Sequence, residues 1–310
     1  MNKTPIIILT GPTAVGKTNL SINLAKKLNA EIISADSMQI YKYMDIGSAK
    51  VTNEEMQGIK HYLVDEVTPD YSFSVSEFQE RAYNYIYDIN NKGKKVLVTG
   101  GTGLYLNSLI YDMDFAKSDA NNEIREKLRL ELEEHGIDYM HNKLRELDND
   151  AAERIHKNNT KRVIRAIEVC LSGEKMNDFS NDLRFNEKYK PIIIVLNRER
   201  EHLYERINKR VDIMMESGLI DEVKTLLNMG YTKDMISMQG IGYKEIIKYL
   251  DGEYTLEEAI EIIKRDSRRY AKRQLTWFRR YSDAKWFNLD EYDDSQVLED
   301  DIIMHIEKML

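Results

Sequence analysis

Apolar residues in the first third of the chain fall into short continuous runs separated by stretches with helical spacing. The run at residues 6–9 predicts a buried strand, and leucines then recur at every fourth position over residues 20–28. A second strand is predicted in EIISADSMQIY (31–41), and KKVLVTGGTGLYLNSLIY (94–111) predicts a third strand, a glycine turn and a helix. Strands that alternate with helices in this order predict an α/β fold with a doubly wound parallel sheet.

One predicted helix between these strands has a clear start and a clear buried face. In SVSEFQERAYNYIYDINNKG (74–93), Ser76 and Gln79 have the spacing of a capping box, and Gly93 lies just past the end. The predicted buried stripe consists of Phe78, Ala82, Ile86 and Ile89.

The middle of the chain changes to a purely helical pattern from about Asp119 to Gly173. An apolar strand follows from Pro191, which a strand tolerates at its first residue. Residues 201–281 are again predicted to be helical, with breaks at MGYTKD and MQGIGYKE. We therefore predict an α/β core with C-terminal helices in residues 1–117 and 190–310, and a helical insertion domain in residues 118–189.

Composition narrows the class of protein. The 310 residues carry a formal net charge of -8, contain one cysteine and show no apolar run long enough to span a bilayer. A disulfide or a cysteine-based zinc site is therefore not expected, and we interpret Cys170 as a small buried hydrophobe. The first residues lack a secretory signal, which predicts a cytoplasmic protein without a membrane partner.

A phosphate-binding pattern joins the first strand to the first helix. The sequence G-x-x-x-x-G-K-[ST] is matched by Gly11, Pro12, Thr13, Ala14, Val15, Gly16, Lys17 and Thr18. Between a strand and a helix, such a loop directs backbone amides at an anion. The pattern alone does not identify the anion, which is ATP in a kinase, GTP in a switch protein, or a phosphate compound that is not a nucleotide.

A carboxylate is predicted at the same edge of the sheet. Phosphoryl-transfer enzymes usually hold Mg²⁺ through the loop Ser/Thr and an Asp that ends a later strand, but here that strand ends in TGGT (99–102). Asp36 instead follows the second strand. It suits a base that accepts a proton from an incoming nucleophile, and equally a helix cap or a metal ligand.

Two basic clusters contrast with the acidic net charge. Residues 264–281 interleave arginines with Tyr270, Trp277, Phe278 and Tyr281, which suits phosphate contacts together with packing or stacking on looped RNA. A smaller cluster in the predicted insertion contains Arg154, His156, Lys157, Lys161, Arg162 and Arg165. The alternatives are a solvated helix face, or pairing of the arginines with the acidic stretch at 289–301.

Five stretches in order, GPTAVGKT, SADSMQIY, GGTGLY, MQGIGYKE and RRYAKRQLTWFRR, closely resemble the tRNA dimethylallyltransferases, also called tRNA isopentenyltransferases. The resemblance runs from residue 6 to about residue 287. It implies transfer of a dimethylallyl group from dimethylallyl diphosphate to N6 of adenosine-37 in tRNAs that read codons beginning with U. The phosphate loop would then hold the diphosphate leaving group.

The resemblance also implies roles for individual residues. Asp36 would accept the proton from N6, while Lys17 and Arg210 would stabilise the departing diphosphate, with Mg²⁺ near Thr18. Arg125 lies early in the insertion, which resembles the family's domain that grips the anticodon stem. The residues implied to bind tRNA are Asp36, Ser37, Met38, Gln39, Thr102, Arg125, Thr160, Lys161, Arg162, Val163, Ile164, Gln239, Gly240, Ile241, Gly242, Tyr243 and Lys244.

Two other kinds of enzyme, adenylate prenyltransferases and P-loop nucleotide kinases, remain as alternatives. Eukaryotic relatives carry a C-terminal Cys2His2 zinc finger, so this chain, with its single cysteine, resembles the shorter bacterial form, for which we expect a monomer. Enzymes that prenylate free adenylate share the first motifs but need neither a long helical insertion nor a basic segment. A P-loop nucleotide kinase is the third reading. The six histidines are scattered without metal-ligand spacing.

Overall fold

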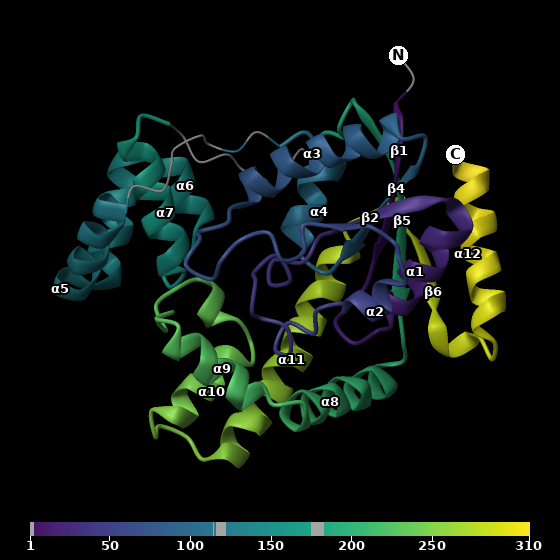
Figure 1. Ribbon diagram of the computed structural model, residues 1–310. Helices are drawn as coiled ribbons and strands as arrows, with labels where there is room; N and C mark the ends of the chain where they lie inside the picture. The colour runs from purple at the N-terminus through teal and green to yellow at the C-terminus, as the bar shows by residue number, and fades with distance from the viewer. Residues whose placement is uncertain (1–2, 114, 116–121, 175–182) are drawn as a thin grey trace. The chain divides into compact units, whose positions relative to one another are not determined.

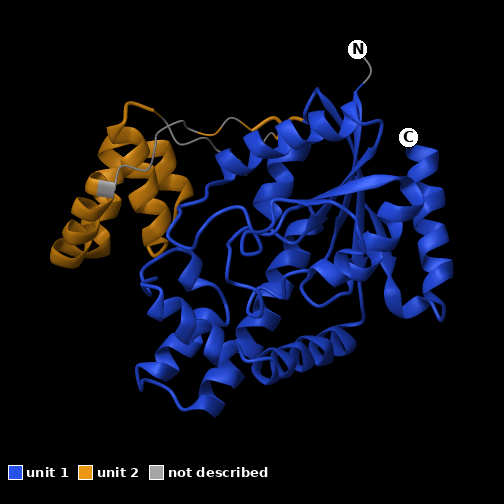
Figure 2. Cartoon of the chain, in the orientation of Figure 1, with its two compact units in different colours: residues 1–111, 185–310 blue, residues 112–184 orange. Residues whose placement is uncertain are grey.

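The computed structural model describes residues 3–113, 115, 122–174 and 183–310. The chain forms two compact units, one of residues 1–111 with 185–310 and one of residues 112–184 (Figure 2). The boundary predicted at residues 117 and 118 lies outside the described residues. The boundary predicted at 189 and 190 falls at the start of strand β5.

The larger unit is built on a six-stranded sheet in which every pairing is parallel, with the order β3-β2-β4-β1-β5-β6. The α/β prediction is therefore confirmed. The strands are β1 (Thr4–Thr10), β2 (Ala30–Ser34), β3 (His61–Tyr62), β4 (Lys95–Gly100), β5 (Tyr189–Asn197) and β6 (Lys285–Asn288).

The register brings the carboxyl ends of the central strands together. Thr10 at the end of β1 lies opposite Gly100 of β4, and Ser34 at the end of β2 lies opposite Thr99. The loops that follow these three strands therefore leave the sheet side by side. In an open parallel sheet this edge is where ligands bind.

Pro191 corrects one detail of the strand prediction. It is the third residue of β5, not the first. The neighbouring strand β6 pairs only with positions 194–197 of β5, whereas Pro191 pairs with Ile6 of β1. A residue without an N–H is tolerated there because β6 does not extend along this part of β5.

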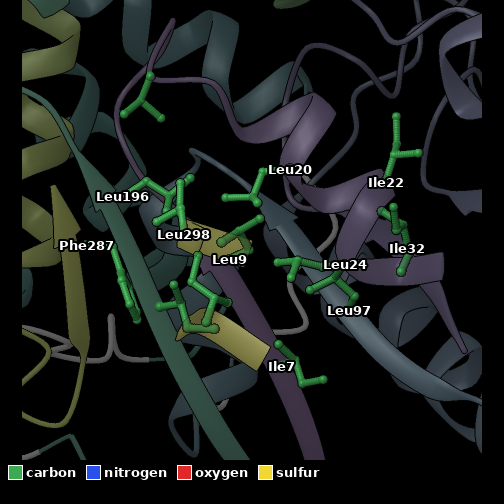
Figure 3. Close-up of a cluster of buried hydrophobic side chains, with 14 of the residues drawn as sticks. Ile7, Leu9, Leu20, Ile22, Leu24, Ile32, Leu97, Leu196, Phe287 and Leu298 are labelled. Atoms are coloured by element: carbon green, nitrogen blue, oxygen red, sulfur yellow. The ribbon is translucent and has the colours of Figure 1, made fainter. Parts of the chain in front are cut away.

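Helices cover both faces of the sheet (Figure 1). Helix α1 (Lys17–Leu28) packs on α12 (Ser295–Met309), and together they bury the apolar cluster drawn in Figure 3. Helix α3 (Val75–Asn91) packs on β2, β4 and α4 (Gly103–Ile110). In β1 the five consecutive residues 6–10 are all buried, as a sheet covered on both faces requires.

The buried stripe of α3 is confirmed, but its predicted cap is wrong. Phe78, Ala82, Ile86 and Ile89 are the buried residues of the helix. The N-cap is Ser74, whose Oγ accepts a hydrogen bond from the Glu77 amide at 3.2 Å. Serines at alternate positions offer competing caps, and the burial of Phe78 in the first turn sets where this helix begins.

The helical prediction for residues 201–281 and its two breaks are confirmed. The helices of this region are α8 (Arg200–Glu216), α9 (Leu219–Asn228), the short η1 (Ser237–Gln239), α10 (Tyr243–Leu250) and α11 (Leu256–Phe278). The larger unit also contains the short helices α2 (Asn53–Met56) and η2 (Leu289–Glu291).

The regular secondary structure in the described residues of the smaller unit is helical. It contains α5 (Asn122–Leu147), interrupted at Gly136 by a φ of 81°, α6 (Asn149–Arg154) and α7 (Thr160–Leu171). Leu128, Leu144 and Ile167 belong to its own apolar core. Cys170 is partly exposed, so its interpretation as a buried hydrophobe is wrong. No helix in the described part of the chain is long and apolar enough to cross a membrane.

Candidate active site

The phosphate loop is held by bonds within its own sequence. Nζ of Lys17 donates to the carbonyl oxygens of Gly11 at 2.8 Å and Pro12 at 2.9 Å. Burial and, to a smaller extent, the charge of Arg210 together lower the pKa of Lys17 to about 7, against an opposing effect of Asp36. The ammonium group therefore lies in the field of a second cation and of the predicted base.

The start of α1 supplies amide donors to the same place. Gly16 caps the helix with a φ of 117°, a left-handed backbone that favours glycine, and the first turn contains no acidic residue. The first amides of a helix have no acceptor within it and attract anions. The amides of Thr13 and Val15 are already used, because they donate to Gln274 Oε1 at 2.9 Å and Pro12 O at 3.3 Å.

Arg210 comes from α8 and lies against the loop. Its Nη1 is 3.4 Å from Oγ1 of Thr13. Burial lowers the pKa of Arg210 and the Asp36 carboxylate opposes that shift. The structure thus brings together three of the residues predicted for chemistry, Lys17, Asp36 and Arg210.

Two arginines that were not predicted from the sequence donate hydrogen bonds to carbonyls of the phosphate loop. Nε of Arg206 donates to Ala14 O at 2.9 Å, and Nε of Arg198 donates to Val15 O at 3.1 Å. Arg198 in turn pairs with Asp290, part of the acidic stretch at 289–301. These bonds hold the carbonyls of Ala14 and Val15 in place. Sequence carried no signal for them, because neither arginine belongs to the loop motif.

The turn after β2 fixes Asp36. Its Oδ1 accepts from the amides of Met38 at 2.9 Å and Gln39 at 3.4 Å, which is the pattern of an Asx-turn. The next amide, of Ser37, donates to Oγ1 of Thr102 at 3.0 Å. The predicted convergence of the strand ends is therefore realised in contacts between the second and third motifs.

An open pocket of about 400 Å³ joins the phosphate loop to this turn. Its lining residues are Lys17, Thr18, Ser21, Ser34, Asp36, Gln39, Val51, His61, Thr99 and Gly100. The hydroxyl of Thr99 is buried and has no hydrogen-bond partner in the described part of the chain. An orphaned hydroxyl beside the Thr18 hydroxyl and a carboxylate is a fitting environment for a hydrated Mg²⁺, which prefers oxygen ligands and retains waters.

Two of the stretches predicted to bind tRNA lie against each other. Gly240 approaches Met38 so closely that a Cβ at residue 240 would be 2.6 Å from the Met38 Cε. Tyr243, from the same stretch as Gly240, is fully buried, and its hydroxyl donates to Glu222 at 2.7 Å. Glu222 also accepts from the amides of residues 45, 46 and 47. Tyr243 therefore stabilises the contact between these two stretches from inside the protein, whereas Gln239 is exposed.

In the smaller unit, the residues predicted to bind tRNA divide by exposure. Lys161 and Arg162 are exposed, whereas Val163 and Ile164 are buried in the unit's own core. Arg125 donates to both carboxylate oxygens of Glu168, at 2.9 and 3.1 Å, and Glu168 is fully buried. An arginine that neutralises a buried carboxylate has a structural role whether or not it also contacts RNA.

The basic segment 264–281 corrects the interpretation of its aromatic residues. Phe278 and Tyr281 are buried, so these rings pack inside the protein and do not offer a stacking surface. Trp277 and Tyr281 both donate to Oδ1 of Asn107.

The predicted alternative, pairing of these arginines with residues 289–301, is also wrong among the described residues. Arg265 and Arg269 pair with Asp266 in their own helix, and the acidic stretch pairs through Glu299 with Lys27. No group of three or more metal-ligating His, Cys, Asp or Glu side chains occurs in the described ranges.

Comparison with known proteins gives one consistent answer. A family model described as IPP transferase matches residues 39–281. A tRNA dimethylallyltransferase of Clostridioides difficile is 76% identical over 306 residues, which cover 99% of this chain and 98% of that protein. The protein with the same name from Alkaliphilus oremlandii is 58% identical over 302 residues, with 97% and 96% coverage.

Solved structures agree with these sequence relatives. The tRNA isopentenylpyrophosphate transferase of Bacillus halodurans has 44% identity and a TM-score of 0.73, with 99% of this chain and 98% of that chain covered. A eukaryotic dimethylallyltransferase acting on tRNA has 30% identity and a TM-score of 0.80, with 97% and 80% covered.

Proposed function

The chain belongs to the IPP transferase family, and on that premise we propose that it transfers a dimethylallyl group from dimethylallyl diphosphate to N6 of adenosine-37 in tRNAs that read codons beginning with U. The observation that carries the proposal is a single pocket that joins the phosphate loop to the carboxylate of Asp36. A kinase would need a carboxylate at the end of β4, where this chain has Thr99 and Gly100.

The leaving group lies in the phosphate loop. When the bond between C1 of the dimethylallyl group and the diphosphate oxygen breaks, the electron pair stays on diphosphate. Lys17, Arg210 and the first amides of α1 are the groups that would stabilise that developing charge. Preorganised donors of this kind stabilise a transition state more than a ground state.

The acceptor side uses Asp36 as the base. As the adenine N6 attacks C1, its proton passes to the carboxylate. The Met38 and Gln39 amides orient Oδ1 of Asp36. In the described chain, no hydrogen bond engages the other carboxylate oxygen, which is the one we assign to the proton. A positioned base typically accelerates such a step by about 10²–10⁴-fold.

Mg²⁺ fits the pocket beside the diphosphate, with Thr18 as the protein ligand and Thr99 and Asp36 within the same lining. When bound, the ion supplies positive charge to the diphosphate oxygens. It adds to a field that Lys17 and Arg210 already provide.

The tRNA contacts proposed for the larger unit are residues 36–39, Thr102, residues 239–241 and Lys244, because Gly242 and Tyr243 are buried. Adenosine-37 must leave the stack of the anticodon loop to approach Asp36, at a cost of a few kcal/mol. Exposed basic residues of the smaller unit, Lys161 and Arg162, supply phosphate contacts.

The test is a choice of acceptors. The purified chain is incubated with labelled dimethylallyl diphosphate and either unmodified tRNA, AMP or ADP. We expect label in tRNA alone, mapped to adenosine-37 by nuclease digestion. Label in AMP or ADP would instead identify an adenylate prenyltransferase, and no transfer to any acceptor would reject the proposed activity.

A further inference from the structure

A buried glutamine of α11 connects two loops that belong to different motifs. Oε1 of Gln274 accepts from the Thr13 amide at 2.9 Å, and its Nε2 donates to the Gly101 carbonyl at 2.9 Å. A backbone amide can only donate and a carbonyl can only accept, so the orientation of the Gln274 amide is fixed by chemistry. Both bonds belong to a side chain that is 5% exposed.

The glycine turn after β4 is shaped to receive this helix. A Cβ at Gly101 would lie 2.2 Å from Nε2 of Gln274, and a Cβ at Gly103 would lie 2.5 Å from the ring of Trp277. Contacts below 3 Å do not occur between real atoms of this kind, so each glycine marks a close approach of α11. Gln274 and Trp277 are three positions apart and lie on the same face of the helix.

The same turn continues to the catalytic base. The Thr102 amide donates to Ala35 O at 3.1 Å, and Oγ1 of Thr102 accepts from the Ser37 amide. The residue between Ala35 and Ser37 is Asp36. A displacement of the turn at Gly101 is therefore passed by two hydrogen bonds to the backbone on both sides of the base.

We propose that Gln274 is a positioning residue that fixes the separation between the phosphate loop and the turn that holds Asp36. This inference rests on the proposed function, in which one loop holds the leaving group and the other holds the base. The transferred carbon lies between them, so attack in line with the leaving group requires a fixed distance. A misplacement of about 1 Å between reacting groups costs about 10²-fold in rate.

The central variant is Gln274→Leu, which places a branched apolar side chain, one bond shorter than glutamine, at this position and removes both bonds. The matched control is Gln79→Leu in α3, where Gln79 Nε2 donates to Ser108 O at 2.8 Å, away from both loops. We expect Gln274→Leu to lower kcat by about 10²-fold while the Kd for tRNA changes less than about threefold. The control should lose comparable thermal stability and keep its kcat.

A second variant keeps the test decisive if Gln274→Leu does not fold. Gln274→Glu retains the acceptor for Thr13, but an ionised carboxylate cannot donate to Gly101 O. Once protonated, the introduced carboxyl group has both a donor and an acceptor. We expect the ratio of its kcat to that of the wild type to rise as pH falls from 8 toward 5, a trend that a loss of packing alone would not produce.

A measurement without substrates separates this inference from the proposed function. Hydrogen–deuterium exchange of the substrate-free protein should rise in residues 11–18 and in residues 100–103 together in Gln274→Leu, and in neither segment in Gln79→Leu. If exchange in the two segments stays at wild-type values, or if kcat falls only in proportion to the unfolded fraction, the inference is overturned. If wild-type protein transfers no dimethylallyl group but exchange behaves as stated, the proposed function fails and the linkage stands.

Discussion

The phosphate loop and the loop after β2 form opposite sides of one pocket, but they are stabilised in different ways. In the phosphate loop, Lys17 and Val15 bond to carbonyls within the same eight residues. In the loop after β2, the anchors are Thr102 and Glu222, which are 65 and about 175 positions away. The phosphate loop therefore has internal bonds in addition to its distant braces from Arg198, α8 and α11, whereas the anchors of the loop after β2 named here lie in distant segments.

This difference separates residues that contact a substrate from residues that hold a loop in place. Apart from Arg210 of α8, the residues proposed to contact the diphosphate lie in one motif, so their removal should change rate more than stability. Residues that hold the acceptor side mostly do not touch a substrate, and their removal should change tRNA affinity and stability together. Four substitutions test that distinction.

The largest effect is expected for Asp36→Asn, which keeps size and hydrogen-bonding geometry at the junction of the two loops. Because an amide does not accept the N6 proton, kcat should fall by roughly 10²–10⁴. Single-turnover transfer measures the loss, and tRNA binding by filter retention serves as the control. Recovery of kcat at high Mg²⁺ would show that Asp36 is a metal ligand and not the base.

Lys17→Ala removes the ammonium group of the phosphate loop, whose bonds lie within the loop itself. Loss of one preorganised cation should lower kcat by roughly 10²–10³ and weaken binding of inorganic diphosphate, measured by calorimetry. The Kd for tRNA should change little, since Lys17 lies in the phosphate loop. A variant with wild-type turnover would remove Lys17 from the proposed mechanism.

Glu222→Gln breaks the distant support instead. A neutral amide cannot accept from three backbone amides and Tyr243 as the carboxylate does, and a hydrogen bond to a charged group is worth about 1.5–3 kcal/mol. We expect a comparable loss of unfolding free energy and about tenfold weaker tRNA binding, or roughly 1.4 kcal/mol. Diphosphate affinity should remain unchanged.

The control for that prediction is the neighbouring Asp221→Asn, since Asp221 is exposed and its nearest cation, Lys224, lies 3.6 Å away. If both variants bind tRNA as the wild type does, the bonds from the amides of residues 45–47 to Glu222 contribute nothing to tRNA binding.

The smallest effect on function is expected for Glu31→Gln, at the opposite end of β2 from Asp36. Burial raises the pKa of Glu31, but hydrogen bonds from Lys94, Tyr62 and Lys92 outweigh it and lower the pKa to about 2. A lowered folded-state pKa stabilises above the unfolded value of 4.5, and this contribution is lost as pH falls toward 2.

Chemical denaturation should therefore show a loss of about 2 kcal/mol for Glu31→Gln at pH 7 and a much smaller loss at pH 2.5. kcat at pH 7 should equal that of the wild type. The exposed Glu80→Gln is the matched control, and an equal loss in both variants would assign the effect to general charge and not to this cluster.

The same contrast explains what could be predicted from the sequence. The phosphate loop, the strand that precedes it and the stripe of α3 depend on local spacing, and all were predictable. The role of Gln274 was not, because its bond to Thr13 spans 261 positions and its place in the stretch RRYAKRQLTWFRR does not indicate a partner. The rings of Phe278 and Tyr281 were misinterpreted for a related reason: a ring that stacks on a base and a ring that is buried in the protein look alike in sequence.

The bracing of the phosphate loop has a consequence for how the protein is made. The motif at residues 11–18 is synthesised before all of its braces, because its fixed form depends on β5, Arg206, Gln274 and finally Asp290, which follow it in the chain. Segments so distant in sequence close last and most slowly during folding. A nascent chain thus carries the diphosphate-binding sequence long before it carries the diphosphate-binding site, and truncation before residue 290 should leave a complete motif without its function.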